Sequence, residues 1–187
     1  MILSAAPSER FGSPKALAPF KGTTVIEHLQ NTLLQTSCDE IIVVLGAHGH
    51  RIFPSIFNHT RIRIVYNKDY NFGQMSSVQA GWRCAGETLE GVLFLPVDCP
   101  LVQASSINTI IDHFKKHQPD ILVPSYHNIK GHPPIFQARL KSEVLGLPMK
   151  AELNSLFTNH PPQTIDIDDI GIIKNFNTPE ELEEINK

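Results

Sequence analysis

Two stretches of the sequence carry residue types that could bind phosphate and a metal ion. In residues 4–15, small residues precede Arg10, Gly12 and Lys15. Small residues let a main chain approach a ligand closely, and N–H groups together with two cations suit a triphosphate. The alternative is a surface loop with two solvated basic side chains, and composition alone favours this plainer interpretation.

The second stretch ends the apolar run of residues 93–97, where Asp98 lies between Pro96 and Pro100. A carboxylate at the C-terminal end of a buried strand can hold Mg²⁺ against phosphate oxygens. Asp98 could instead cap the next turn. Its place in an alternating α/β pattern favours the metal-binding interpretation.

A third candidate is the segment of residues 73–81, which opens a predicted helix after a strand. Helix N-termini bind anions, and the hydroxyls of Ser76 and Ser77 could contact a base. The alternative is that one of these serines is a simple N-cap. The histidines are weaker signals: His48 and His50 fit loop residues best, and His132 stands out only because two prolines follow it.

Three common catalytic signatures are absent from the sequence. It has no GxxxxGK[ST] motif, no GxGxxG motif after the first strand and no GxSxG motif. These absences disfavour a P-loop ATPase, a standard dinucleotide dehydrogenase and a hydrolase with a nucleophile elbow.

Hydrophobic patterning indicates the elements that position these residues. Apolar runs predict strands at residues 1–3, 40–45, 61–66, 91–97 and 120–124. Helical spacing between them predicts helices that begin after Thr24, near residue 52, at residue 76 and at residue 105. A further strand is expected at residues 163–167 and a terminal helix from Thr178. This alternation predicts a three-layer α/β fold with a mainly parallel sheet and helices on both faces.

We expect one domain over residues 1–187, with two parts. Residues 1–124 form the part that binds the triphosphate-bearing ligand. Residues 125–187 add mixed strands that form one wall of a cleft. Ligands of such sheets bind at the carboxyl ends of the strands, so the loops after the strands are the predicted site.

Composition narrows the function classes. The chain has 187 residues, of which 41% are hydrophobic and 19% charged, with a net charge of −3. No basic block suggests nucleic-acid binding, and no apolar run approaches membrane-spanning length. Three widely spaced cysteines fit neither a disulfide framework nor a zinc site, so we expect free thiols in the cytoplasm, without a signal peptide.

Five segments in order resemble the MobA-like NTP transferase family, and within it the molybdenum cofactor cytidylyltransferases. The segments are residues 3–17, 72–77, 95–102, 131–136 and 175–182. The resemblance implies Mg²⁺-dependent transfer of a nucleoside monophosphate from an NTP, CTP above all, to a phosphorylated acceptor such as molybdopterin cofactor. It also implies a molybdoenzyme or its chaperone as a partner. Two alternatives stay open: a sugar- or alditol-phosphate nucleotidyltransferase, which residues 131–134 disfavour, and a catalytically impaired nucleotide- or pterin-binding homologue.

The resemblance also implies roles for individual residues. Catalysis falls to Lys15, Arg10 and Asp98, and the metal to Asp98 and Asn177. The nucleotide would contact Leu3, Ser4, Ala5, Ala6, Gly73 and Ser77. The acceptor would contact Gly131, His132 and Pro133.

Two departures from the family pattern bear on activity. The first loop has Ala6 and Pro7 where the family has glycine and a polar residue; we expect it to be remodelled around Pro7, with Ala6 at an ordinary φ. The closing segment has Asn175 and Asn177 where aspartates are common, which lowers the charge available to a metal ion. The aspartates at positions 166, 168 and 169 are candidates to compensate.

Overall fold

The computed structural model describes residues 1–186 and is built around a parallel sheet. Its strands run in the order β5 (Ile62–Tyr66), β4 (Ile41–Leu45), β1 (Ile2–Ser4) and β7 (Leu95–Pro96). All three pairings are parallel. The carboxyl ends of these strands therefore lie at one edge, and the loops that follow them come together there.

A mixed sheet continues from this one. It runs in the order β11 (Gln163–Asp166), β8 (Ile121–Tyr126), β10 (Ile135–Gln137) and β6 (Gly91–Leu93), and β9 (Ile129–Lys130) pairs with β8. The single strand predicted at residues 91–97 is wrong, because it divides at Phe94. Its first half pairs antiparallel with β10 and its second half parallel with β1.

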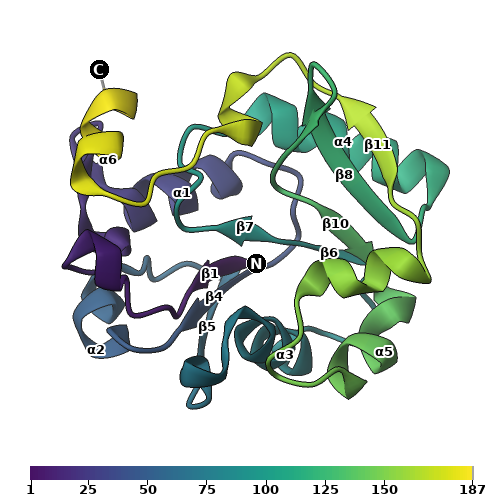
Figure 1. Ribbon diagram of the computed structural model, residues 1–187, viewed down its shortest axis with the longest axis horizontal. Coiled ribbons are helices and arrows are strands. Elements are labelled where there is room, and N and C mark those ends of the chain that lie inside the picture. Colours follow the sequence, from purple (N-terminus) through teal and green to yellow (C-terminus); the bar gives the residue numbers. More distant parts are fainter. Residues whose placement is uncertain (187) are drawn as a thin grey trace.

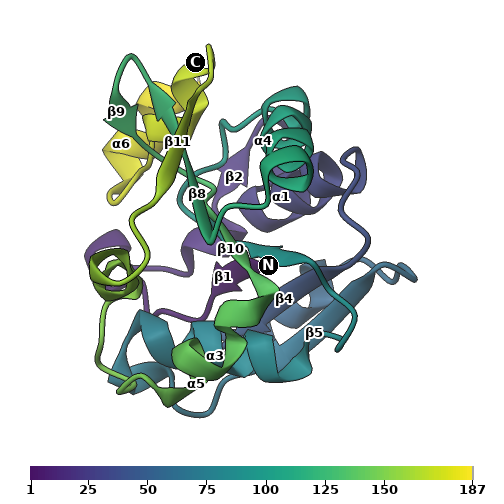
Figure 2. The same ribbon diagram turned by 90° about the vertical axis from the view of Figure 1, so that its right-hand side faces the viewer.

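Helices cover both faces of the sheets, as the sequence predicts. In Figures 1 and 2, α1 (Val25–Leu34) and α4 (Ala104–His117) lie on one side, and α3 (Gln74–Cys84) and α5 (Lys141–Gly146) on the other. The three-layer α/β fold with a mainly parallel central sheet is thereby confirmed.

Alternation along β4 divides the core between the two faces. Val43 packs with the helices α1 and α4, whereas Val44 packs with α3 and α5. Both side chains are fully buried. Burial on both faces explains why this strand reads as an unbroken apolar run.

Short elements complete the chain. They are β2 (Pro19–Phe20), β3 (Thr23–Thr24), α2 (Gly49–Ile52), α6 (Pro179–Ile185) and the 3₁₀ turns η1 (Glu9–Phe11), η2 (Lys15–Leu17), η3 (Phe53–Ser55), η4 (Tyr70–Phe72), η5 (Ala138–Leu140), η6 (Leu153–Thr158) and η7 (Ile170–Ile173). Thr24 caps α1 in a capping box with Glu27, and Thr178 caps α6, as their positions in the sequence predict.

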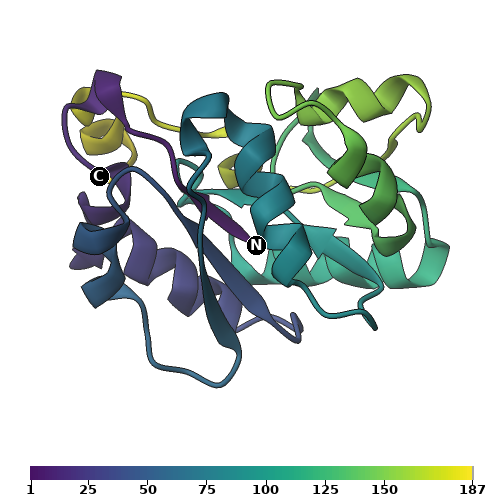
Figure 3. The same cartoon turned by 90° about the horizontal axis from the view of Figure 1, so that it is seen from below.

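Segments from both ends of the sequence lie side by side. In Figures 1 and 3 the yellow C-terminal helix α6 is next to the purple residues that follow β1.

Within residues 1–186, no helix combines the length and the apolar character needed to cross a membrane.

A polar cluster outside the main core joins the start of β8 to α5 and to the loop after η6. The two ring nitrogens of His160 lie 2.8 Å from Asp120 and 2.7 Å from Glu143, and Arg139 also pairs with Asp120. These carboxylates stabilise the imidazolium. The hydrogen bonds to Asp120 and then to Glu143 raise the pKa of His160 above its usual value.

This cluster predicts a pH dependence of stability. Because the folded-state pKa of His160 is raised, its contribution is fully present below about pH 6.5 and is lost as the pH rises through the folded-state value. We expect the free energy of unfolding, measured with urea between pH 6 and 9, to fall more steeply in the wild type than in His160→Gln. The exposed His50→Gln is the control and should keep the wild-type slope. Equal slopes in all three proteins would contradict the prediction.

Candidate functional site

A cavity of about 560 Å³ opens at the carboxyl end of the parallel sheet. The loops after β1, β5 and β7 form much of its wall, and the segment before α6 supplies Asn177. Predicted site residues that line it are Leu3, Ser4, Ala5, Ala6, Arg10, Lys15, Gly73, Ser77, Asp98 and Asn177. The predicted nucleotide, catalytic and metal positions therefore share one cavity.

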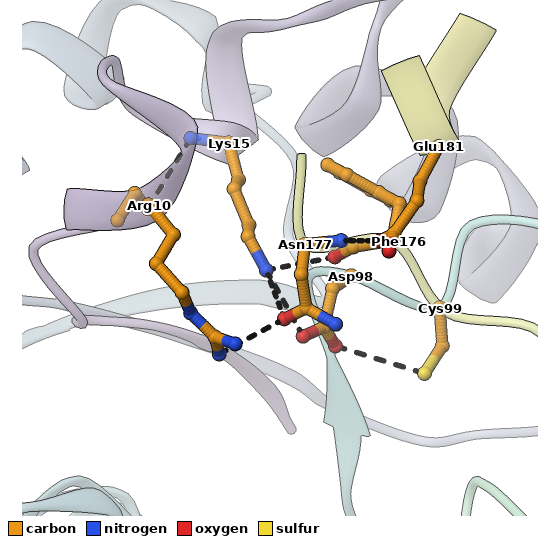
Figure 4. A network of polar contacts seen from close by, with 8 residues as sticks. Arg10, Lys15, Asp98, Cys99, Phe176, Asn177 and Glu181 are labelled. Atoms are coloured by element: carbon orange, nitrogen blue, oxygen red, sulfur yellow. Dashed lines mark hydrogen bonds and ion pairs between the residues drawn. The ribbon is translucent and has the colours of Figure 1, made fainter. Parts of the chain in front are cut away.

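The ammonium group of Lys15 is at the centre of a polar network on one side of this cavity (Figure 4). It donates to the main-chain oxygen of Phe176 at 2.7 Å, to Oδ1 of Asn177 at 3.1 Å and to Oδ2 of Asp98 at 3.4 Å. Arg10 reaches the same Oδ1 of Asn177 at 3.4 Å. The side chain of Lys15 is only 11% exposed, so the solvated-surface interpretation of this lysine is wrong.

Main-chain and aromatic contacts hold the C-terminal segment against the site. The N–H of Phe176 donates to the main-chain oxygen of Asp98 at 3.1 Å. The Phe176 ring is fully buried and meets Phe11 edge-to-face, with 5.5 Å between centroids. Asn177 follows directly and is fixed by these contacts beside Lys15.

Cys99 adjoins Asp98 but has no nucleophilic character. Its thiol is buried and lies 3.7 Å from Oδ1 of Asp98. Burial, reinforced by the neighbouring carboxylate, raises the pKa of Cys99 well above its usual value. A raised pKa favours the protonated thiol, which is a poor nucleophile, so Cys99 fits a structural role beside Asp98.

In the loop after β1, Ala6 has the ordinary φ expected from the proline that follows it. Ala6 is not among the non-glycine residues at positive φ, whereas Ser8 is, at 56°. Two contacts from outside the cavity hold the loop. The N–H of Ala47 donates to the main-chain oxygen of Ala5 at 3.0 Å, and Nε2 of His48 lies 2.8 Å from the main-chain oxygen of Pro7. His48 thus contacts the loop itself.

The N-terminus of α3 is arranged differently from the simple cap considered for Ser76 or Ser77. The N-cap is Gly73, whose φ of 113° favours glycine. Both serines are buried and accept hydrogen bonds from Nδ2 of Asn67, at 2.8 and 3.0 Å, and Ser76 donates to the oxygen of Gly73. Neither serine caps the helix.

The predicted acceptor residues lie outside this cavity. Gly131, His132 and Pro133 are not among the residues that line it within the described chain. A Cβ on Gly131 would overlap the oxygen of Ile172, and the N–H of His132 donates to that same oxygen at 2.7 Å. Burial lowers the pKa of His132, although the charge of Asp98 opposes the shift.

The aspartates considered as replacements for the missing metal carboxylates are absent from the cavity wall in the described residues. Asp169 is buried and accepts from Ser106 Oγ at 2.7 Å and from the N–H groups of Gln103 and Gly171 at 3.0 and 2.8 Å. It fastens the chain before the C-terminal segment to the start of α4. Asp166 accepts from Ser125, and Asp168 is exposed.

Sequence reasoning missed three polar residues that follow β5. Tyr70 and Asn71 line the cavity, and Asn67 holds the two serines of α3. The available signal was their place after a predicted strand, at the edge where the other loops meet.

The oxygen atoms around Lys15 fit a divalent cation. They comprise one carboxylate, one amide oxygen and one main-chain carbonyl, all of them hard ligands. Mg²⁺ usually takes one or two carboxylates and completes its shell with water and substrate phosphate. Asp98 and Asn177 could supply the protein's share of such a shell.

Comparison with known proteins agrees with this architecture. The domain model described as "MobA-like NTP transferase domain" matches residues 1–164, which confirms the resemblance inferred from the sequence. Nicotine blue oxidoreductase of Paenarthrobacter nicotinovorans is 29% identical over 178 residues, covering 90% of this chain and 85% of that protein. Molybdenum cofactor cytidylyltransferase of Escherichia coli K12 is 23% identical over 186 residues, covering 97% and 92%.

Solved structures share the fold. Rv0371c of Mycobacterium tuberculosis H37Rv superposes with a TM-score of 0.84 at 22% identity, over 98% of this chain and 95% of that one. A structure of the same protein described as a complex with manganese gives 0.79 at 20% identity, over 99% and 95%.

Proposed function

This chain belongs to the MobA-like NTP transferase family, and from that premise we propose that it transfers a nucleoside monophosphate from an NTP to a phosphorylated acceptor. The observation that carries the proposal is the meeting of Lys15, Asp98 and Asn177 in the cavity that the loop after β1 also lines. Two cationic side chains, small-residue backbone and oxygen ligands are the parts that triphosphate chemistry needs.

The reaction requires one bond to form and one to break. A phosphate oxygen of the acceptor attacks the α-phosphorus of the NTP, and the bond from that phosphorus to the bridging oxygen breaks. Its electron pair leaves with diphosphate. Such chemistry depends on positioning and on neutralising charge rather than on a covalent enzyme intermediate.

Each lining group has a place in this scheme. Lys15 and Arg10 neutralise the triphosphate and the departing diphosphate, and the backbone of Ser4–Ala6 lies along the nucleotide, with Ser77 toward the base. Asp98 and Asn177 would hold Mg²⁺, which would supply further charge neutralisation.

We assign nucleotide binding to residues 1–124 of a single domain and the acceptor side to residues 125–187. The charge of Asp98 acts on the pKa of His132, which supports placing Gly131, His132 and Pro133 on the acceptor side of the site. The burial that lowers the pKa of His132 favours a neutral imidazole at this position. We propose CTP as the nucleotide and molybdopterin cofactor as the acceptor, supported by the likeness to the cytidylyltransferase of E. coli and by residues 131–136.

Diphosphate release tests the proposal. The purified chain is incubated with Mg²⁺, each of the four NTPs in turn, and molybdopterin cofactor or a sugar phosphate as acceptor. We expect release with CTP and molybdopterin cofactor. Release with a sugar phosphate alone would overturn the acceptor, release with another NTP would overturn the base, and no release with any pair would overturn the activity.

The likeness to nicotine blue oxidoreductase favours a second candidate, oxidation or reduction of a small molecule bound at the same site. Absorbance at 340 nm during incubation with NADH or NADPH and an oxidised heteroaromatic dye tests this candidate separately.

Lys15→Ala is expected to slow diphosphate release about a hundredfold. Loss of one charge-stabilising donor typically costs about 3 kcal/mol in the transition state. Lys174→Ala is the matched control. Lys174 is exposed and lies two positions before Phe176, so its substitution removes one positive charge outside the cavity and should keep the wild-type rate. Equal rates for Lys15→Ala and the wild type would remove Lys15 from the mechanism.

Ala6→Gly is expected not to tighten nucleotide binding. Because Ala6 already has an ordinary φ, glycine relieves no strain and only adds unfolded-state entropy, which costs about 0.4–1 kcal/mol of stability. Titration calorimetry with CTP and Mg²⁺, together with urea unfolding, measures both effects. A clear gain in affinity would show that the loop is strained at Ala6.

A further inference from the structure

The ammonium group of Lys15 has the surroundings of a bound cation. Its three oxygen partners come from Phe176, Asn177 and Asp98, at 2.7, 3.1 and 3.4 Å, and the side chain is 11% exposed (Figure 4). An ammonium group has three hydrogens to donate. All three are engaged with protein oxygens, so none is left for a phosphate.

These partners are also the oxygens that fit a divalent cation. Together they carry one formal negative charge, that of Asp98, and the ammonium group cancels it. Arg10 adds a second positive group at 3.4 Å from Asn177, while Glu181 accepts from the main-chain N–H of Asn177. A divalent ion that approached Asp98 and Asn177 would meet oxygens already in use and two like charges.

We propose that, before a nucleotide binds, Lys15 occupies the divalent-cation position on Asp98 and Asn177. The phosphates of an incoming NTP offer Lys15 a stronger, more highly charged set of oxygens and draw the ammonium group away. The two side chains then become free for the metal, which binds with the nucleotide or after it. The nucleotide step rests on the proposed function, whereas the blocking of the metal by Lys15 does not.

Removing the lysine should therefore create metal binding in the absence of nucleotide. The experiment titrates Mn²⁺ into the protein without nucleotide and follows free aqueous Mn²⁺ by electron paramagnetic resonance. The proteins are the wild type, Lys15→Met and, as a matched control, Lys174→Met, which removes an exposed positive charge from the chain before Phe176. We expect Lys15→Met to bind Mn²⁺ about tenfold or more tightly than the other two.

A double variant identifies the ligands. Lys15→Met combined with Asp98→Asn should lose the gain, because the carboxylate that holds the ion is gone. Circular dichroism and thermal unfolding establish that each variant is folded. Equal Mn²⁺ affinity of the wild type and Lys15→Met would overturn the proposal, and so would a gain that survives Asp98→Asn.

A nucleotide arm separates this proposal from the proposed function. Adding CTP to the wild type should form a protein–CTP–Mn²⁺ complex, detected by enhanced water proton relaxation over CTP with Mn²⁺ alone. If Lys15→Met gains affinity for Mn²⁺ but no NTP produces the complex, the blocking role stands and the proposed function fails. If the wild type releases diphosphate but Lys15→Met gains nothing, the function stands and the blocking role is wrong.

Discussion

Asp98→Ala is expected to lower metal-dependent diphosphate release about a thousandfold or more, while the fold is retained. This carboxylate is the single acidic group among the oxygens around Lys15, and a bound metal contributes several kcal/mol to transition-state stabilisation. A thousandfold loss corresponds to about 4 kcal/mol. The Asp98 side chain is 26% exposed, so its removal leaves no cavity in the core. The measurement is the rate of diphosphate release with saturating CTP and acceptor.

Asp112→Ala is the control for this prediction. Asp112 is an exposed aspartate of α4 outside the cavity wall, and its loss should leave the rate unchanged. Thermal unfolding of both variants separates a lost reaction from a lost fold. If Asp98→Ala keeps a rate near that of the wild type, the metal assignment is wrong.

Asp169→Ala is expected to destabilise the protein by about 3–5 kcal/mol and to impair the site as a result. The substitution removes the acceptor of three hydrogen bonds and leaves the donors on Gln103, Ser106 and Gly171 without partners; those on Ser106 and Gly171 are buried. Each unsatisfied buried donor costs about 1–3 kcal/mol. The chain that leads to Phe176 and Asn177 is then no longer fastened to α4. Urea unfolding measures the loss.

Asp168→Ala provides a neighbouring control with the same change in charge. Its side chain is exposed, so the free energy of unfolding should change by less than about 0.5 kcal/mol. Similar losses in the two variants would mean that charge, rather than the buried hydrogen bonds, sets the stability of this segment.

Sequence patterns within single segments predicted most of the helices and strands. The main error, the single strand expected at residues 91–97, arose because strand pairing cannot be read from such patterns. The capping box at Thr24 and Glu27 and the cap at Thr178 mark helix starts directly in the sequence. The split at Phe94 has no comparable signal, because an apolar run contains nothing that says which strand each half will pair with. The small hairpin of β2 and β3 was also missed, since two-residue strands are too short to show a period.

The site was predictable where a rule of topology applied. Asp98 and the loop after β1 follow parallel strands, and such loops meet at one edge. The rule gives the position of a residue in the fold but does not say whether an acidic side chain there is free to bind a metal ion or is already occupied by hydrogen bonds. Asp169 looked like a replacement for a metal carboxylate, and only the packed structure shows that its oxygens already serve Ser106 and two main-chain N–H groups.

The ribosome adds Lys15 to the chain long before it adds Asn177, the residue with which Lys15 pairs. The two residues are 162 positions apart. At about 5–20 residues per second, roughly 10–30 s of translation separate their appearance. The nascent chain therefore carries Lys15 and later Asp98 for many seconds before their last partner exists. The polar network around Lys15 is therefore complete only once nearly all of this sequence has been translated.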